Sequence, residues 1–232
     1  MTSAVLDSSV VGLGVMTLQA QVRRQYNLWS RLDYALNPRD FSLPEVGHDT
    51  RHLLLIPKGL TVDSLLDELW LKYLIRVESS VLNEKTIDPE FSVRNNSNHG
   101  YAIFANSNLE ADVDYANVSA DVLSQGCVRG MTLIERLVFE AVTFLGNCNH
   151  ALDTEGTLTL CSGDRFSDGT VPTVCCRPIA RKSARNPDPC PDEAYSKGRK
   201  PGPETKLGIV IGSVSPHERF EHIRTREVFT CK

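Results

Sequence analysis

The side chains best suited to chemistry are cysteines, and they gather in the C-terminal half of the sequence. Cys175 and Arg181 have the Cys-x5-Arg spacing with which cysteine phosphatases hold a phosphate beside a thiolate nucleophile. The residues between them include no glycine, and Pro178 lacks the backbone N–H that a phosphate-binding loop needs. No Cys-x2-Cys pair could place two thiolates on one ion, so we predict buried thiols, no metal and no cofactor. The seven cysteines are Cys127, Cys148, Cys161, Cys175, Cys176, Cys190 and Cys231.

Charged side chains in the turns of the same half form a second set of candidates. An arginine there can clamp an anionic ligand, although an arginine in an irregular loop more often donates to nearby carbonyls and carboxylates. Asp168 stands in a Ser-Asp-Gly turn with too few oxygen ligands around it in sequence to indicate calcium. Ser162 could join the local histidines and acids in hydrolysis, but no nucleophile-elbow motif accompanies it. We predict as ligand-binding residues Arg165, Asp168, Arg219 and Arg224.

The composition is that of a globular chain with one unusual segment. The 232 residues are 41% hydrophobic, enough for a sizeable core, and the formal net charge is −4. Residues 177–206 hold six of the twelve prolines, eight basic residues and four acidic ones, so they contribute +4 and the rest of the chain −8. We expect an exposed, mobile insertion between strands. The acidic remainder offers no extended basic face, so nucleic acid is disfavoured as a partner.

The N-terminal sequence indicates neither export nor a membrane span. The apolar run Val10–Met16 has no lysine or arginine before it and is too short to cross a bilayer. We therefore expect a cytoplasmic protein with reduced thiols, which an odd number of cysteines also suits.

Hydrophobic spacing predicts mixed helices and strands in the first 150 residues. Asn37-Pro38 should end the first helix, and Thr132 and Glu135 match a capping box that opens the last one. The expected elements are a helix over 17–36, a strand over 52–56, a helix over 61–77, a strand over 101–105 and a helix over 132–147.

After residue 150 the pattern becomes β-like and rich in turns. Residues 157–161 alternate between polar and apolar, as in a half-buried strand, and Ser-Gly-Asp and Ser-Asp-Gly turns follow. The strands expected in this part are 157–161, 171–176, 207–211 and 227–230.

Three stretches of the sequence resemble a family of uncharacterised bacterial proteins. They are Gly130–Leu137 (GMTLIERL), His150–Asp153 (HALD) and Thr159–Pro172 (TLCSGDRFSDGTVP). The likeness also includes Pro-Lys-Gly-Leu-Thr at 57–61 and the segment 207–228, and it implies no assigned activity.

The last part of the chain is also similar to the C-type-lectin-like fold of formylglycine-generating-enzyme type. The matching positions are Ser162–Arg165, Pro216–Arg219, Arg224 and Arg226. This resemblance implies a scaffold that displays binding loops. Cys175-Cys176 replace the aromatic residue that the pattern leads us to expect after Val174, and the insertion replaces a short turn.

Together these features predict an α+β protein. A helix-rich α/β region, residues 1–150, would pack on a β-rich, C-type-lectin-like segment, residues 151–232. We expect a non-catalytic binding module that holds a protein or small ligand between loops 162–170 and 213–224. The alternative is a thiol-dependent or hydrolytic enzyme that uses Cys161 or Cys175.

Overall fold

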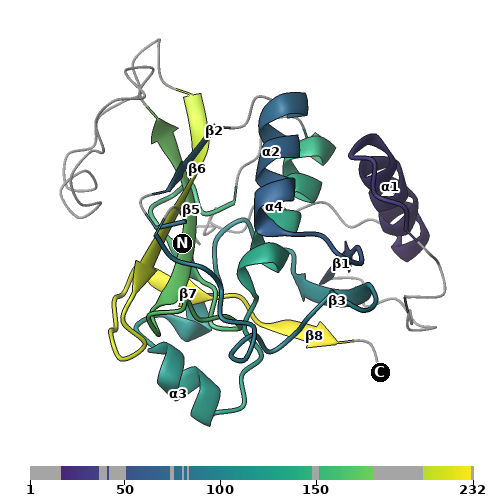
Figure 1. Ribbon diagram of the computed structural model, residues 1–232. Helices are drawn as coiled ribbons and strands as arrows, with labels where there is room; N and C mark the ends of the chain where they lie inside the picture. Colours follow the sequence, from purple (N-terminus) through teal and green to yellow (C-terminus); the bar gives the residue numbers. More distant parts are fainter. Residues whose placement is uncertain are drawn as a thin grey trace, which may run out of the picture.

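The computed structural model describes residues 17–36, 41, 51–73, 76–79, 81–82, 84–147, 152–179 and 206–230. Helices and two sheets are combined in an α+β fold, as predicted (Figure 1). The elements are α1 (Leu18–Arg31), β1 (Arg51–Ile56), α2 (Val62–Tyr73), β2 (Arg76–Ser79), β3 (Tyr101–Asn106), η2 (Val113–Tyr115), α3 (Ala120–Gln125), α4 (Leu133–Asn147), β4 (Leu158–Leu160), β5 (Val171–Ile179), β6 (Lys206–Val214), β7 (Ile223–Thr225) and β8 (Val228–Thr230).

The two sheets each combine strands from before and after residue 150. The smaller sheet has the order β1-β3-β8 and is antiparallel. The larger has the order β2-β6-β5-β4-β7, with parallel pairs at β2·β6 and β4·β7. Strand β8 thus joins the N-terminal strands and β2 joins the C-terminal ones, so the predicted boundary at residue 150 does not separate the sheets.

Helix α4 is the centre of the fold. It contacts β1 of the small sheet and β5 of the large one, and α2 packs beside it (Figure 1). The five residues 137, 138, 139, 141 and 142 are all buried, as expected for a helix that has neighbours on several sides. In the described ranges no helix is both long and apolar enough to cross a membrane.

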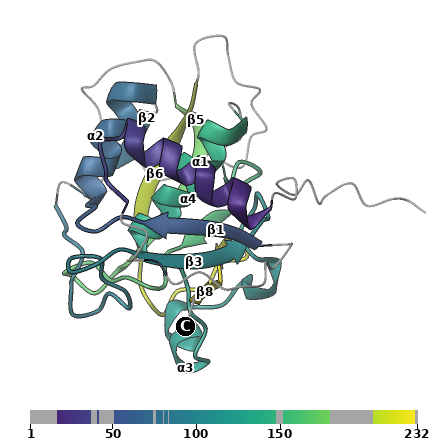
Figure 2. The ribbon, with the colours of Figure 1, turned by 90° about the vertical axis from the view of Figure 1, so that its right-hand side faces the viewer.

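Helix α1 lies along the open edge of β1 (Figure 2), and two of its glutamines form hydrogen bonds with that edge. Gln21 accepts a hydrogen bond from Leu53 N (2.7 Å), and Gln25 accepts one from Leu55 N (2.7 Å). The amide of Gln25 also donates to Leu53 O (2.5 Å). The glutamines stand one helical turn apart, so their side chains replace a neighbouring strand and protect an edge that would otherwise pair with another chain.

Two helices end earlier than the hydrophobic pattern predicts. Helix α1 ends at Arg31 rather than at residue 36, because the chain turns there and Asp33 adopts a left-handed φ of 59°. Helix α2 ends at Tyr73 rather than at about 77, because Arg76–Ser79 pair with β6 as strand β2. At α2 the tertiary pairing with β6 overrides the local helical spacing.

Strands β5 and β6 extend into both ends of the predicted insertion. Arg177–Ile179 belong to β5 and Lys206 begins β6, so the bounds 177–206 are wrong by a few residues. Pro178 is tolerated because β4 pairs with β5 only at residues 173 and 174, which leaves the later part of β5 with one open edge. The rest of the insertion, residues 180–205, lies outside the described residues.

Candidate functional site

The first turn of α4 is capped by side chains from two parts of the chain. Glu135 accepts a hydrogen bond from Thr132 N (2.8 Å), and Thr132 Oγ1 accepts one from Glu135 N (3.3 Å), which confirms the capping box. Asp164, from the loop after β4, accepts a hydrogen bond from Leu133 N (2.7 Å). The loop is thereby fixed to the start of the helix.

Arg94 neutralises the carboxylate of this cap. Its guanidinium donates to both Glu135 oxygens (2.5 and 2.8 Å) and to Gly130 O (2.6 Å), and Tyr101 donates to Glu135 Oε1 (2.9 Å). Burial alone would lower the pKa of Arg94, but the Glu135 carboxylate outweighs it and the pKa is raised. Burial and the same carboxylate raise the pKa of Tyr101. Arg94 therefore stays charged and Tyr101 neutral.

A second buried network is formed around Arg136, which directly follows Glu135 in α4. Arg136 pairs with Glu140 (2.8 Å) and Asp153 (2.9 Å), and Asp153 pairs in turn with Arg226 (2.7 Å). Thr159 Oγ1 donates to Asp153 (2.5 Å). Burial alone would raise the pKa of Asp153, but the two arginines outweigh it and the pKa is lowered. Burial raises the pKa of Glu140, against the pull of Arg136.

These networks contain residues from the three stretches quoted in the sequence, among them Glu135, Asp153 and Asp164. Stretches 130–137 and 159–172 meet at the start of α4, where a Cβ added to Gly163 would lie 2.8 Å from Gly130 O. Arg226 also donates to the carbonyls of Asn108 (2.8 Å) and Leu109 (2.7 Å). Arg136, Glu140, Asp153 and Arg226 are buried and paired with opposite charges, so these residues hold the fold together.

The two predicted binding loops meet at Asp121 of α3. One carboxylate oxygen lies 3.8 Å from Arg165 Nη2 in loop 162–170, and the other lies 2.5 Å from His217 Nδ1 in the loop before β7. The backbone N–H of Asp121 also donates to Pro216 O (3.2 Å). Arg165 further donates to the carbonyls of Ser162 (3.3 Å) and Asp164 (2.9 Å), so part of its bonding capacity holds its own loop.

Lys85 joins the same loops from the other side. Its ammonium group lies 2.7 Å from Asp168 and donates to Thr170 Oγ1 (3.3 Å) and Ser213 Oγ (3.1 Å). Hydrogen bonds to Lys85 and Thr170 lower the pKa of Asp168. The structure therefore places Asp168 in an ion pair that fastens loop 162–170 to the end of β6.

The other two predicted residues lie after β6 in the sequence. Arg219 is exposed in the loop between β6 and β7. Arg224 is half-buried on β7, the edge strand of the large sheet, and its Nε is buried without a hydrogen-bond partner.

Several segments combine into one region, which we call the loop cluster: residues 84–94, 113–125, 162–170 and 215–222. Backbone hydrogen bonds connect Asp88 to Arg165 (2.9 Å), Val93 to Gly163 (3.0 Å) and Asn117 to Phe220 (3.3 Å). Six large hydrophobic side chains are exposed in the described part of the chain, and five belong to this region. The five are Phe91, Val93, Val113, Val122 and Phe220.

Of the described cysteines, Cys127 is exposed and the other three lie inside the protein. Cys161, Cys175 and Cys176 are buried, and burial raises the pKa of Cys161 and of Cys176 well above its ordinary value. Ser162 shares a hydrogen bond with Thr225 (3.0 Å) rather than with a histidine. Across the described residues no three histidine, cysteine or acidic side chains could hold a metal ion together. Arg181, Cys190 and His150 lie outside those residues.

No protein-family model, curated protein or solved structure matches this chain. The sequence locates the two loops by their turns, but nothing in the local sequence marks Asp121, Lys85 or Phe91, which only tertiary contacts bring to the loops.

Proposed function

We propose that this protein is a non-catalytic binding module that holds a protein partner on the loop cluster. The observation that carries the proposal is the concentration of exposed hydrophobic side chains there, beside Arg165 and Arg219. Phe91 is 62% exposed and Phe220 37% exposed. Aromatic residues and arginine are the types enriched in the energetic centres of protein interfaces.

The fold beneath the loop cluster suits display rather than chemistry. Loop 162–170 is held by Asp164 at α4, by Arg165 at α3 and by the ion pair between Lys85 and Asp168. A surface held in place in this way loses little conformational entropy when a partner binds. The resemblance to C-type-lectin-like modules, which also present loops from a fixed scaffold, supports the same function.

The enzymatic alternative finds less support. Cys161 and Cys175 are buried, and Cys161 has a raised pKa rather than the lowered pKa of a thiolate nucleophile. The described cysteines are free thiols, which favours a reducing, cytoplasmic setting for the binding.

Iodoacetamide labelling near neutral pH separates the two functions. We expect slow labelling of Cys161 and Cys175, whereas rapid labelling of either would favour the enzyme.

Site-specific photo-cross-linking tests the proposal directly. A photoreactive phenylalanine analogue is placed at position 91, 122 or 220 of the full chain, in cells that make the protein. We expect one protein adduct of the same size from all three positions, because each faces the partner.

Position 27 supplies the matched control, because Asn27 is exposed on α1 and lies outside the loop cluster. The proposal requires that the shared adduct be absent from position 27. Equal adducts from all four positions, or none from the three test positions, would contradict it.

A further inference from the structure

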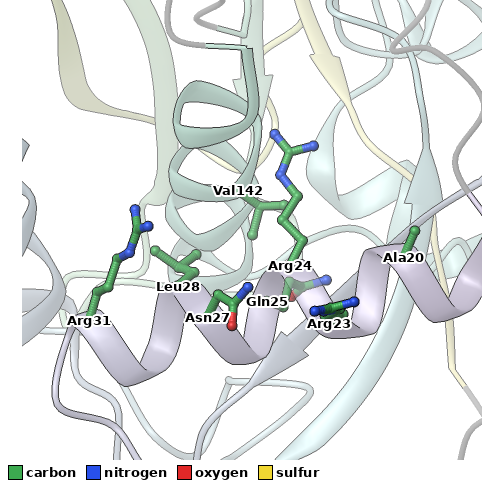
Figure 3. A pocket seen from close by; sticks show the side chains of 8 residues that line it. All are labelled: Ala20, Arg23, Arg24, Gln25, Asn27, Leu28, Arg31 and Val142. Atoms are coloured by element: carbon green, nitrogen blue, oxygen red, sulfur yellow. The ribbon is translucent and has the colours of Figure 1, made fainter.

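An open groove of about 340 Å³ lies between α1 and α4, away from the loop cluster (Figure 3). Its walls combine three arginines with the buried apolar side chains of Leu28 and Val142. The arginines are Arg23, Arg24 and Arg31. Its volume is in the range of small-molecule sites.

The helical spacing of α1 arranges these groups as two cations around an apolar patch. Arg24 and Arg31 are seven residues apart, so they project from one face of the helix about 10 Å apart along its axis. Leu28 lies between them, and both guanidinium groups extend to the side on which Val142 stands (Figure 3). Arg23 adds a third cation at the rim.

The groove is also electrostatically one-sided. Helix α1 contains no acidic residue, and among the described residues that line the groove there is no aspartate or glutamate. The positive charge of Arg24 reaches the buried ring of His52, whose pKa is lowered to about 4 by burial and by this arginine. Arg24 and Arg31 also interact with other groups of the protein. Each guanidinium has five N–H donors, so it can bond a ligand and its protein partner at the same time.

We infer that this groove binds a small amphiphilic anion, with its carboxylate, sulfonate or phosphate group on Arg24 and Arg31 and its apolar part on Leu28 and Val142. An anionic group leaves water at a free-energy cost, and pairing with the two guanidinium groups offsets that cost. The positive charge of the groove therefore selects an anion. The apolar floor selects a ligand with a hydrocarbon or aromatic body over a bare inorganic ion. This site is independent of the loop cluster.

The test is a fluorescence titration of the full chain with 8-anilinonaphthalene-1-sulfonate, a sulfonate on an aromatic body. We expect saturable binding at one site.

The double variant Arg24→Gln, Arg31→Gln should weaken the binding of the probe roughly tenfold or more. Asn27→Asp, an isosteric change at an exposed position of the lining, should weaken it severalfold with little risk to folding. Lys58→Gln, at an exposed position outside both the groove and the loop cluster, is the matched control and should leave the binding unchanged.

Competition identifies the class of ligand. Decanoate should displace the probe, and inorganic phosphate at equal concentration should not. Three results would overturn the inference: no saturable binding, binding that Asn27→Asp and the double variant leave unchanged, or displacement by phosphate as effective as by decanoate. Stronger displacement by an acidic peptide than by decanoate would also overturn it, in favour of a protein segment as the occupant.

Discussion

The start of α4 and the loop cluster both contain many charges, but they use them differently. At α4, Arg136 and Arg226 are buried and are paired with carboxylates at 2.7–2.9 Å. In the loop cluster, Asp121 and His217 form their pair at the surface, and exposed aromatic residues stand on the same segments. The first arrangement fixes the fold, and the second leaves charge and apolar surface open to a partner.

This contrast shows why an arginine-rich motif is weak evidence of a site. The buried pairs resist disruption because removing one partner leaves the other uncompensated. Exposed pairs contribute little to stability, so their residues are free to serve binding. The variants below test this division, beginning with the largest expected effect.

Asp153→Asn should cause the largest loss of stability. The substitution leaves Arg136 and Arg226 buried with one carboxylate fewer, which costs about 3–5 kcal/mol of unfolding free energy. Urea denaturation, followed by circular dichroism, measures this loss of unfolding free energy. A loss below about 1 kcal/mol would show that the network does not stabilise the fold.

Gly163→Ala should cost about 1–3 kcal/mol. The new Cβ would lie 2.8 Å from Gly130 O and 3.0 Å from Met131 O, and these backbone atoms cannot move away independently. Gly126→Ala, where the nearest atom is 3.3 Å away, is the milder control and should cost less. Equal denaturation midpoints for the two variants would mean that the loop does not pack tightly on α4.

The unfolding free energy should depend on pH through the buried carboxyl group of Asp164. Burial raises the pKa of Asp164 to about 6, although its hydrogen bond from Leu133 N opposes the shift. Because the pKa is higher in the folded state, this group stabilises the fold below its ordinary pKa near 4, and that contribution is lost as the pH rises through 6. Asp164→Asn keeps the acceptor and removes the charge.

The wild type should therefore gain about 1 kcal/mol relative to Asp164→Asn between pH 7.5 and pH 5. Taking the difference between the two proteins cancels His52 and the other titrating groups. Parallel stability curves over this range would contradict the assignment.

Asp121→Asn should have the smallest effect on stability, below about 1 kcal/mol, because its pairs with Arg165 and His217 are partly exposed. Thermal unfolding of the wild type and the variant at two salt concentrations measures this change in stability. A loss as large as that of Asp153→Asn would remove the distinction between the two regions.

The sequence predicts the local elements well and the long-range ones poorly. The strand at 101–105 and the capping box at Thr132 are confirmed because hydrophobic alternation and capping chemistry are local. Strand β2 was not predicted, since the pairing of Arg76–Ser79 with β6 depends on residues about 130 positions away. The candidate loops could be located from their turns, but the partners Asp121 and Lys85 come from other elements.

The binding surface is tested most directly by one variant in which both the cross-linked adduct and the unfolding free energy are measured. In the full chain with the photoreactive residue at position 122, Phe220→Ser should reduce the partner adduct at least fivefold. The unfolding free energy should change by less than about 1 kcal/mol, because Phe220 is a partly exposed loop residue. An undiminished adduct would contradict the account and place the binding surface elsewhere on the molecule.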